Sequence, residues 1–167
     1  MLKDSRSSKI FAGAVAAALT LAAFASLALA AAEQTRESYV AAVEPICKTN
    51  VKANERFLGG VEKEVKQGKL KLAGTQVAKA NAAGKKAVTQ IKAVPMPAAD
   101  ATKLTKWIGY LEREQKLLGE ISTALKANKK ARVQSLRVQL THNGTLANDE
   151  VLGFEFHYCH IETGKLG

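Results

Sequence analysis

Aromatic residues, prolines and strand-forming patterns are all scarce in this sequence. Phe, Trp and Tyr make up 5% of the 167 residues, and there are three prolines. No stretch alternates apolar and polar residues for long enough to predict a β-strand. Ala, Lys, Leu, Glu and Gln, which favour helices, are abundant instead. The composition therefore argues against a β-rich fold and predicts an all-helical one.

The first thirty residues have the pattern of a secretory signal peptide. Basic residues at Lys3, Arg6 and Lys9 precede an apolar run at 10–32, and Ala28-Leu29-Ala30 provides small residues for cleavage. We therefore expect residues 1–30 to be removed and the protein to be secreted or to act in the cell envelope. An uncleaved membrane anchor is the alternative, because about twenty apolar residues can span a bilayer.

Apolar residues recur every three or four positions in four blocks of the remaining domain, 31–167. We expect helices at about 36–66, 70–94, 100–125 and 130–158. The connections between them are short, which places successive helices side by side and opposite in direction. The predicted fold is an all-α, antiparallel up-down-up-down four-helix bundle.

Two features disturb the first predicted helix. Pro45 lacks a backbone N–H, so it either kinks the helix or marks its start. Gly59 and Gly60 weaken the middle of the same helix.

The two cysteines provide a test of this layout. In an up-down-up-down bundle, Cys47 near the start of the first helix and Cys159 near the end of the last lie at the same end. An exported protein is expected to pair them in a disulfide. Because there is no C-x-x-C motif, a structural rather than a redox-active disulfide is predicted.

Positive charge dominates the chain, which has 25 basic and 15 acidic side chains. The turns at one end of the predicted bundle collect a group that we call the lysine-rich end: Lys66, Lys69, Lys71, Lys126, Lys129, Lys130 and Arg132. Such a cluster suits anionic cell-envelope polymers or lipid head groups. The alternative is a solvated turn region without a partner. No motif or interleaved aromatic residue predicts specific binding of nucleic acid.

The opposite end of the predicted bundle is aromatic. It collects the following residues together with the two cysteines: Tyr39, Trp107, Tyr110, Phe154, Phe156 and Tyr158. One interpretation is a ligand pocket between helices. The other is that these large side chains close the end of the bundle around the disulfide.

Histidines provide only weak candidates for a metal or haem site. His157 and His160 are three residues apart, as a metal-binding pair on a helix would be, but no third ligand is evident. Haem attachment through C-x-x-C-H would need a cysteine where Phe156 stands. No motif for nucleophilic or acid–base catalysis is present, and Glu112 and Glu114 are interpreted as surface charges. We therefore expect a non-catalytic protein without a cofactor.

The segments 39–47 (Tyr-Val-Ala-Ala-Val-Glu-Pro-Ile-Cys) and 154–159 (Phe-Glu-Phe-His-Tyr-Cys) resemble the ends of small exported bacterial helical proteins of unknown function. This resemblance implies no activity. The sequence favours an exported helical-bundle protein that binds anionic envelope components through its lysine-rich end. The alternative function is a carrier of a small ligand, haem or metal that uses the aromatic and histidine-containing end.

Overall fold

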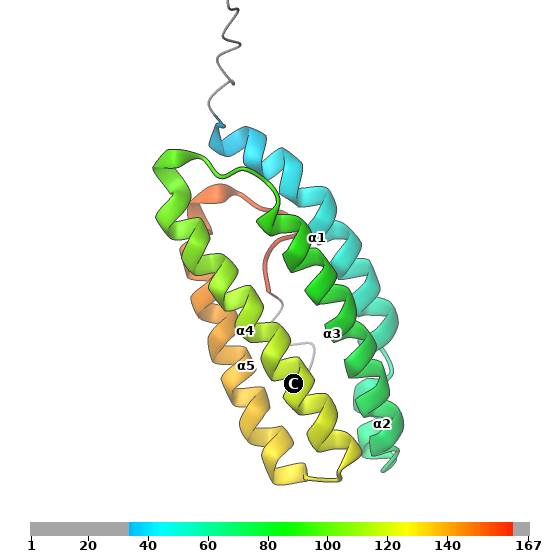
Figure 1. Ribbon diagram of the computed structural model, residues 1–167. Helices are drawn as coiled ribbons and strands as arrows, with labels where there is room; N and C mark the ends of the chain where they lie inside the picture. Colours follow the sequence, from blue (N-terminus) through cyan, green and yellow to red (C-terminus); the bar gives the residue numbers. More distant parts are fainter. Residues whose placement is uncertain (1–33, 162–167) are drawn as a thin grey trace, which may run out of the picture. The chain divides into compact units, whose positions relative to one another are not determined.

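The computed structural model describes residues 34–161, and the predicted leader lies outside this range. Four long helices and shorter helical segments make up this part of the chain, with no strand between residues 34 and 161 (Figure 1). The elements are α1 (Arg36–Leu58), α2 (Val61–Lys66), α3 (Leu70–Lys92), η1 (Ala98–Asp100), α4 (Ala101–Lys126), α5 (Lys130–Glu150) and η2 (Leu152–Phe154). The prediction of an all-helical bundle is confirmed. None of the helices described is long and apolar enough to cross a membrane.

The long helices pack in the order α1, α3, α4, α5, each against its neighbour in that series (Figure 1). Contacts between α3 and α4 step in opposite directions along the two helices. Gly74 of α3 meets Ser122 of α4, whereas Lys92, farther along α3, is paired with Glu112, farther back on α4. Among the residues described, α1 and α5 make no comparable contact. The bundle is therefore open along the side between these two helices.

The closest approach of α3 and α4 depends on Gly74. A Cβ atom at Gly74 would lie 2.8 Å from both the carbonyl oxygen of Ser122 and Cγ of Lys126. The Ser122 hydroxyl also donates a hydrogen bond of 2.7 Å to the Gly74 carbonyl oxygen. Only a glycine allows the two backbones to come this close without displacement of a neighbour.

The first predicted helix is divided in two, so its continuous course over 36–66 is wrong. α1 ends at Leu58 and α2 begins at Val61, because Gly59 and Gly60 form a turn between them. Pro45 lies inside α1, which excludes it as the start of the helix. The helix begins instead at a capping box, in which Thr35 and Ser38 satisfy each other's backbone N–H groups.

The last predicted helix is shorter than expected, and its course to residue 158 is wrong. α5 ends at Glu150, and Glu155 adopts a left-handed conformation with φ of 55°. The chain then turns back as a non-helical segment, residues 155–161, which we call the tail. A helix continued to Cys159 would have placed that residue about 13 Å beyond Glu150 along the axis.

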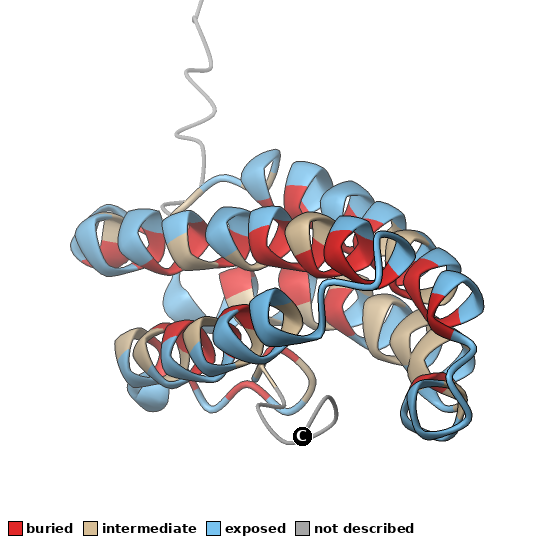
Figure 2. Ribbon diagram, turned by 90° about the horizontal axis from the view of Figure 1, so that it is seen from below, coloured by how far each residue is buried: buried red, intermediate tan, exposed pale blue. Residues whose placement is uncertain are grey.

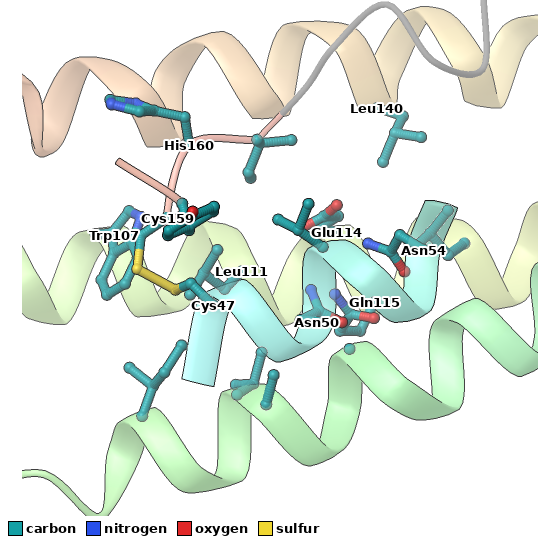
Figure 3. Close-up of a pocket in the computed structure, with 18 of the residues that line it drawn as sticks. Cys47, Asn50, Asn54, Trp107, Leu111, Glu114, Gln115, Leu140, Cys159 and His160 are labelled. Atoms are coloured by element: carbon teal, nitrogen blue, oxygen red, sulfur yellow. A yellow bond between two sulfur atoms is a disulfide. The ribbon is translucent and has the colours of Figure 1, made fainter. Parts of the chain in front are cut away.

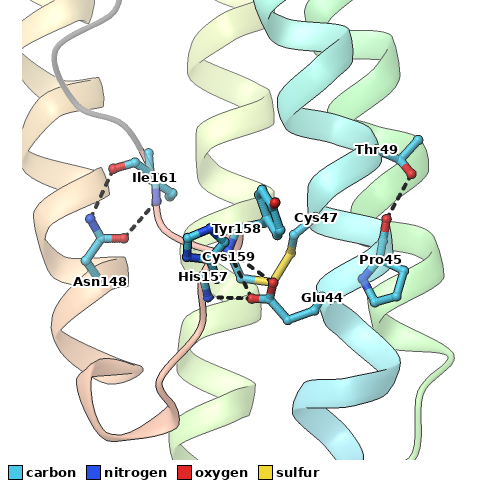
Figure 4. Close-up of a disulfide and its surroundings, with 9 residues drawn as sticks. All are labelled: Glu44, Pro45, Cys47, Thr49, Asn148, His157, Tyr158, Cys159 and Ile161. Carbon is cyan, nitrogen blue, oxygen red and sulfur yellow. Dashed lines mark hydrogen bonds between the residues drawn. A yellow bond between two sulfur atoms is a disulfide. The ribbon is translucent and has the colours of Figure 1, made fainter.

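Side-chain hydrogen bonds hold the tail in place on both sides (Figure 4). The Glu44 carboxylate of α1 accepts hydrogen bonds from the backbone N–H groups of His157 (2.7 Å) and Tyr158 (3.0 Å). The Asn148 carboxamide of α5 donates to the Ile161 carbonyl oxygen and accepts from its N–H, at 3.0 and 2.8 Å. The tail thereby bridges α1 and α5.

The predicted disulfide between Cys47 and Cys159 is present, with a Cα–Cα distance of 5.1 Å (Figure 4). Its position differs from the expected one. Cys47 lies halfway along α1, and Cys159 reaches it because the tail turns back.

Two separate hydrophobic clusters form the core, and Figure 2 shows the buried residues on the inward faces of the helices. The first cluster surrounds Trp107 and the disulfide, and includes Tyr39, Val43 and Leu104. The second surrounds Ile121 at the other end, and includes Val77 and Leu136. α1 contributes buried residues only from its first half, at Tyr39, Val43 and Cys47.

We predict that the double substitution Cys47→Ser, Cys159→Ser lowers the free energy of unfolding by about 4 kcal/mol. The disulfide closes a loop with a sequence separation of 112 residues, so its loss restores freedom to the unfolded chain. Urea titration followed by far-ultraviolet circular dichroism measures the change. The serine variant should no longer respond to dithiothreitol. A native protein whose stability is unchanged by reduction would contradict the prediction.

Candidate functional site

A cavity of about 110 Å³ lies on the open side of the bundle, between the two hydrophobic clusters (Figure 3). All four long helices and the tail contribute to its wall. Most of the wall is apolar, with Leu111 and Leu118 of α4 and Leu140 of α5 among its members. A cavity of this size can hold a small molecule or several waters.

Three carboxamides make one part of this wall polar (Figure 3). Asn50 and Asn54 lie one turn apart on the same face of α1, and Gln115 faces them from α4. The side-chain oxygen of each is buried and accepts no hydrogen bond. Buried polar atoms almost always have a partner, so three unpaired oxygens at one cavity require an explanation.

Gln115 owes its position to a glycine on the facing helix. A Cβ atom at Gly84 of α3 would lie 2.6 Å from Cδ of Gln115 and closer still to its side-chain oxygen. The Gln115 carboxamide therefore lies directly on the backbone of α3, and the residue is only 6% exposed.

Glu114 adds a carboxyl group to the same wall. The residue is half-buried, and burial raises the pKa of its carboxyl group to about 7. The charge of Arg137, which also lines the cavity, acts on a different residue. It adds to the lowering of the Glu62 pKa, which is caused mainly by the hydrogen bond and charge of Lys66. Glu114 therefore has no compensating cation within the described structure.

The tail closes the cavity at the end nearest the disulfide. Tyr158, Cys159, His160 and Ile161 line it there, with Cys47 opposite. The disulfide thus forms part of the cavity wall as well as a link between segments (Figure 3).

The aromatic end is largely packed core. Phe156 stacks between Trp107 and Phe154, with ring centroids 5.4 and 5.6 Å apart, and Arg36 lies over Phe154. Tyr39 is fully buried, and this burial raises its pKa to about 12. These side chains close the bundle around the disulfide, which was one of the two interpretations of the sequence. Of the six aromatic residues, only Trp107 and Tyr158 also line the cavity.

All seven residues of the predicted lysine-rich end are exposed. They flank the α2–α3 and α4–α5 connections, and Lys126 lies against Gly74 of α3, which joins the two groups. Lys66 is paired with Glu62 and Arg132 with Glu120. The other five have no ion pair among the described residues: Lys69, Lys71, Lys126, Lys129 and Lys130.

His157 and His160 do not form the helical pair that their spacing suggested, because the tail is not helical. Both are exposed, and the His157 ring packs edge-on against Tyr158 at 4.5 Å. Between residues 34 and 161, no three His, Cys, Asp or Glu side chains are grouped so that they could hold a metal ion.

The polar part of the cavity was not anticipated from the sequence. Glu114 is not the surface charge that was expected, since it lines the cavity together with Gln115. One signal was present: Asn50 and Asn54 lie three and seven residues after Cys47, at positions of the apolar stripe of the first helix.

No protein-family model, curated protein or solved structure matches the chain. The case for a function therefore rests on the geometry of the chain itself.

We predict that Glu114 makes the folded protein less stable as the pH rises from about 4.5 to about 7. Its pKa in the folded state is above the usual value of 4.5, so the native state binds more protons than the unfolded state in this window. Glu114→Gln should remove up to about 3 kcal/mol of this pH dependence. Urea titrations at pH 4.5, 6 and 8 measure it. Asp149→Asn, an exposed substitution on α5, is the control for the loss of one carboxyl group. Identical profiles for native protein and Glu114→Gln would show that the carboxyl group titrates normally.

Proposed function

We propose that the protein is an exported binding protein whose cavity holds a small, partly apolar molecule with hydrogen-bonding groups. The apolar part of the ligand would contact the leucines of α4 and α5. Its polar groups would meet Asn50, Asn54 and Gln115. This replaces the anionic-polymer function expected from the sequence as the leading hypothesis, and moves the ligand site from the aromatic end towards the middle of the bundle.

The three unpaired carboxamide oxygens are the observation that carries this proposal. Leaving a buried acceptor without a donor costs about 1–3 kcal/mol. Leucine at these positions would join the two hydrophobic clusters and avoid that cost. Polar groups retained beside a cavity are typical of a ligand site, where a few placed hydrogen-bonding groups set orientation and specificity.

Export and topology are part of the proposal. A disulfide is compatible with an oxidising compartment outside the cytosol, and the leader pattern of residues 1–30 points the same way. The α3–α4 contacts run in opposite directions along the two helices, which supports antiparallel packing and an up-down-up-down course. We propose binding without catalysis, because Glu114 is the one acidic residue among the described residues that line the cavity, and the imidazole there, that of His160, is on an exposed residue.

We predict that small polar–apolar fragments raise the melting temperature of the native protein and do so less in Gly84→Ala. The added methyl group would displace the Gln115 carboxamide and so remove one hydrogen-bonding partner of the ligand. A fragment screen by thermal unfolding compares each variant with and without each fragment, so a lower intrinsic stability of Gly84→Ala does not obscure the result.

Gly109→Ala is the matched control, since a Cβ atom there meets nothing within 4 Å. It should gain up to about 1 kcal/mol of stability from helix propensity and keep the full fragment response. Equal fragment responses in both alanine variants, or none in the native protein, would argue against a ligand site at Gln115.

Anion binding at the lysine-rich end is a second candidate function. Two observations favour it. Five of its lysines have no ion pair among the described residues, and the α2–α3 and α4–α5 connections that carry them lie close together, since Lys126 of α4 contacts Gly74 of α3. Flexible lysines of this kind suit anionic surfaces that need no fixed geometry.

For this second function, we predict that the protein co-sediments with phosphatidylglycerol vesicles and that Lys129→Glu with Lys130→Glu abolishes the association. Binding should also be lost at about 1 M salt, where the screening length falls to about 3 Å. Lys103→Glu with Lys116→Glu, at two exposed positions of α4, makes the same change in net charge and serves as the control. Association that survives high salt, or that this control weakens equally, would exclude an electrostatic role for this end.

A further inference from the structure

The polar part of the cavity offers acceptors that lack donors, and the buried Nε1–H of Trp107, elsewhere in the same lining, is a donor that lacks an acceptor. The side-chain oxygens of Asn50, Asn54 and Gln115 are buried and unpaired, and Glu114 stands beside Gln115 in the chain and lines the same cavity. A carboxylate accepts hydrogen bonds only, through two oxygens. A ligand that satisfies this wall must therefore bring several N–H or O–H donors.

The charged and titratable groups around the cavity favour a cationic donor near Glu114. α1 and α3 contribute neutral residues to the lining, α4 contributes Glu114, α5 contributes Arg137, and the tail contributes Tyr158 and His160. Burial is what perturbs Glu114, and the charge of Arg137 acts on Glu62 instead. Among the described residues, the Glu114 carboxyl group thus has no ion-pair partner, and burial of an unpaired carboxylate is costly.

We propose that the cavity binds a small organic cation, an alkylammonium or guanidinium group with a short apolar body, and that Glu114 is its counter-ion. An ammonium group carries three donors, enough for the carboxylate and two of the amide oxygens. Its apolar body would lie against Leu111, Leu118 and Leu140. This inference rests on the proposed ligand-binding function and specifies its ligand class.

The net positive charge of the chain does not exclude such a ligand. Long-range repulsion is screened over about 8 Å at physiological ionic strength, whereas contact with a buried carboxylate is screened much less. An anionic ligand of the same size would face the Glu114 carboxyl group and three unpaired acceptors, so it would leave the wall unsatisfied.

Three probes of equal apolar size test the ligand class: n-butylammonium, n-butanol and n-butyrate. Chemical-shift titrations of the ¹⁵N-labelled protein, read at the side-chain NH₂ groups of Asn50, Asn54 and Gln115, report binding in the cavity. We expect butylammonium to bind most tightly, with an affinity that rises roughly tenfold from pH 6 to pH 8 as Glu114 ionises. The amine stays protonated over this range, as the lysine amine does.

Glu114→Gln should bind butylammonium more weakly at pH 8 and with no pH dependence, while its affinity for butanol is unchanged. Lys165→Gln, which removes a cation outside the described residues, serves as a further comparison and should bind like the native protein. Tighter butylammonium binding in Lys165→Gln would mean that the chain supplies its own cation, which would overturn the proposal.

The outcomes distinguish the cationic ligand class from the ligand-binding function itself. Binding of butanol or butyrate as tightly as butylammonium would overturn the cationic ligand class but leave the ligand-binding function standing. An absence of shifts at all three carboxamides with every probe would overturn both.

Discussion

The disulfide between the middle of α1 and the returning tail is the constraint on which the rest of the structure depends. Among the long helices, α1 packs only against α3, so its other side has no helical neighbour within the described part of the chain. The tail fills that side near the first hydrophobic cluster, held by Cys47, Glu44 and Asn148. Tyr158, Cys159, His160 and Ile161 of the tail also line the cavity, so the position of the covalent link along α1 helps to form its wall.

The polar layer that separates the two hydrophobic clusters is the second constraint, and it lowers the stability of the fold in favour of the proposed binding site. The two hydrophobic clusters meet at a layer that contains Asn50, Asn54 and Gln115 where a bundle selected for stability alone would carry leucine. Unpaired buried acceptors weaken the folded state. The disulfide, which restricts the unfolded chain, offsets such a cost. A covalent link and a polar layer thus complement each other in a small domain.

Local rules predicted the helices and the cysteine pair, and long-range contacts determined what those rules missed. Period-3.6 spacing located the four helical blocks because each has a face buried against a neighbour. The ends of the first and last blocks were wrong for different reasons. Gly59 and Gly60 were recognised as weak, but whether two glycines bend or break a helix depends on what packs beyond them. The return of the tail depends on Glu44, more than 110 residues away, and no local pattern encodes such a pairing. The polar wall was missed because its members lie on separate helices, and because Glu114 stands among Glu112, Arg113 and Lys116, where a surface position is the ordinary expectation.

The pH response of the protein and the binding of a cation are two consequences of one residue. Burial raises the pKa of Glu114 to about 7, so above that pH the folded protein contains a carboxylate that has no ion-pair partner among the described residues. A bound ammonium group would act as the counter-ion of the Glu114 carboxylate. It would therefore stabilise the folded protein most above about pH 7, where the ionised carboxylate lowers the stability of the ligand-free protein. By linkage, a ligand that prefers the ionised form lowers the pKa of Glu114 to the same extent that ionisation raises its affinity. A purely structural carboxyl group would show the pH response of stability alone, whereas a ligand counter-ion must also show a ligand-induced fall in its pKa that matches the gain in ligand affinity on ionisation.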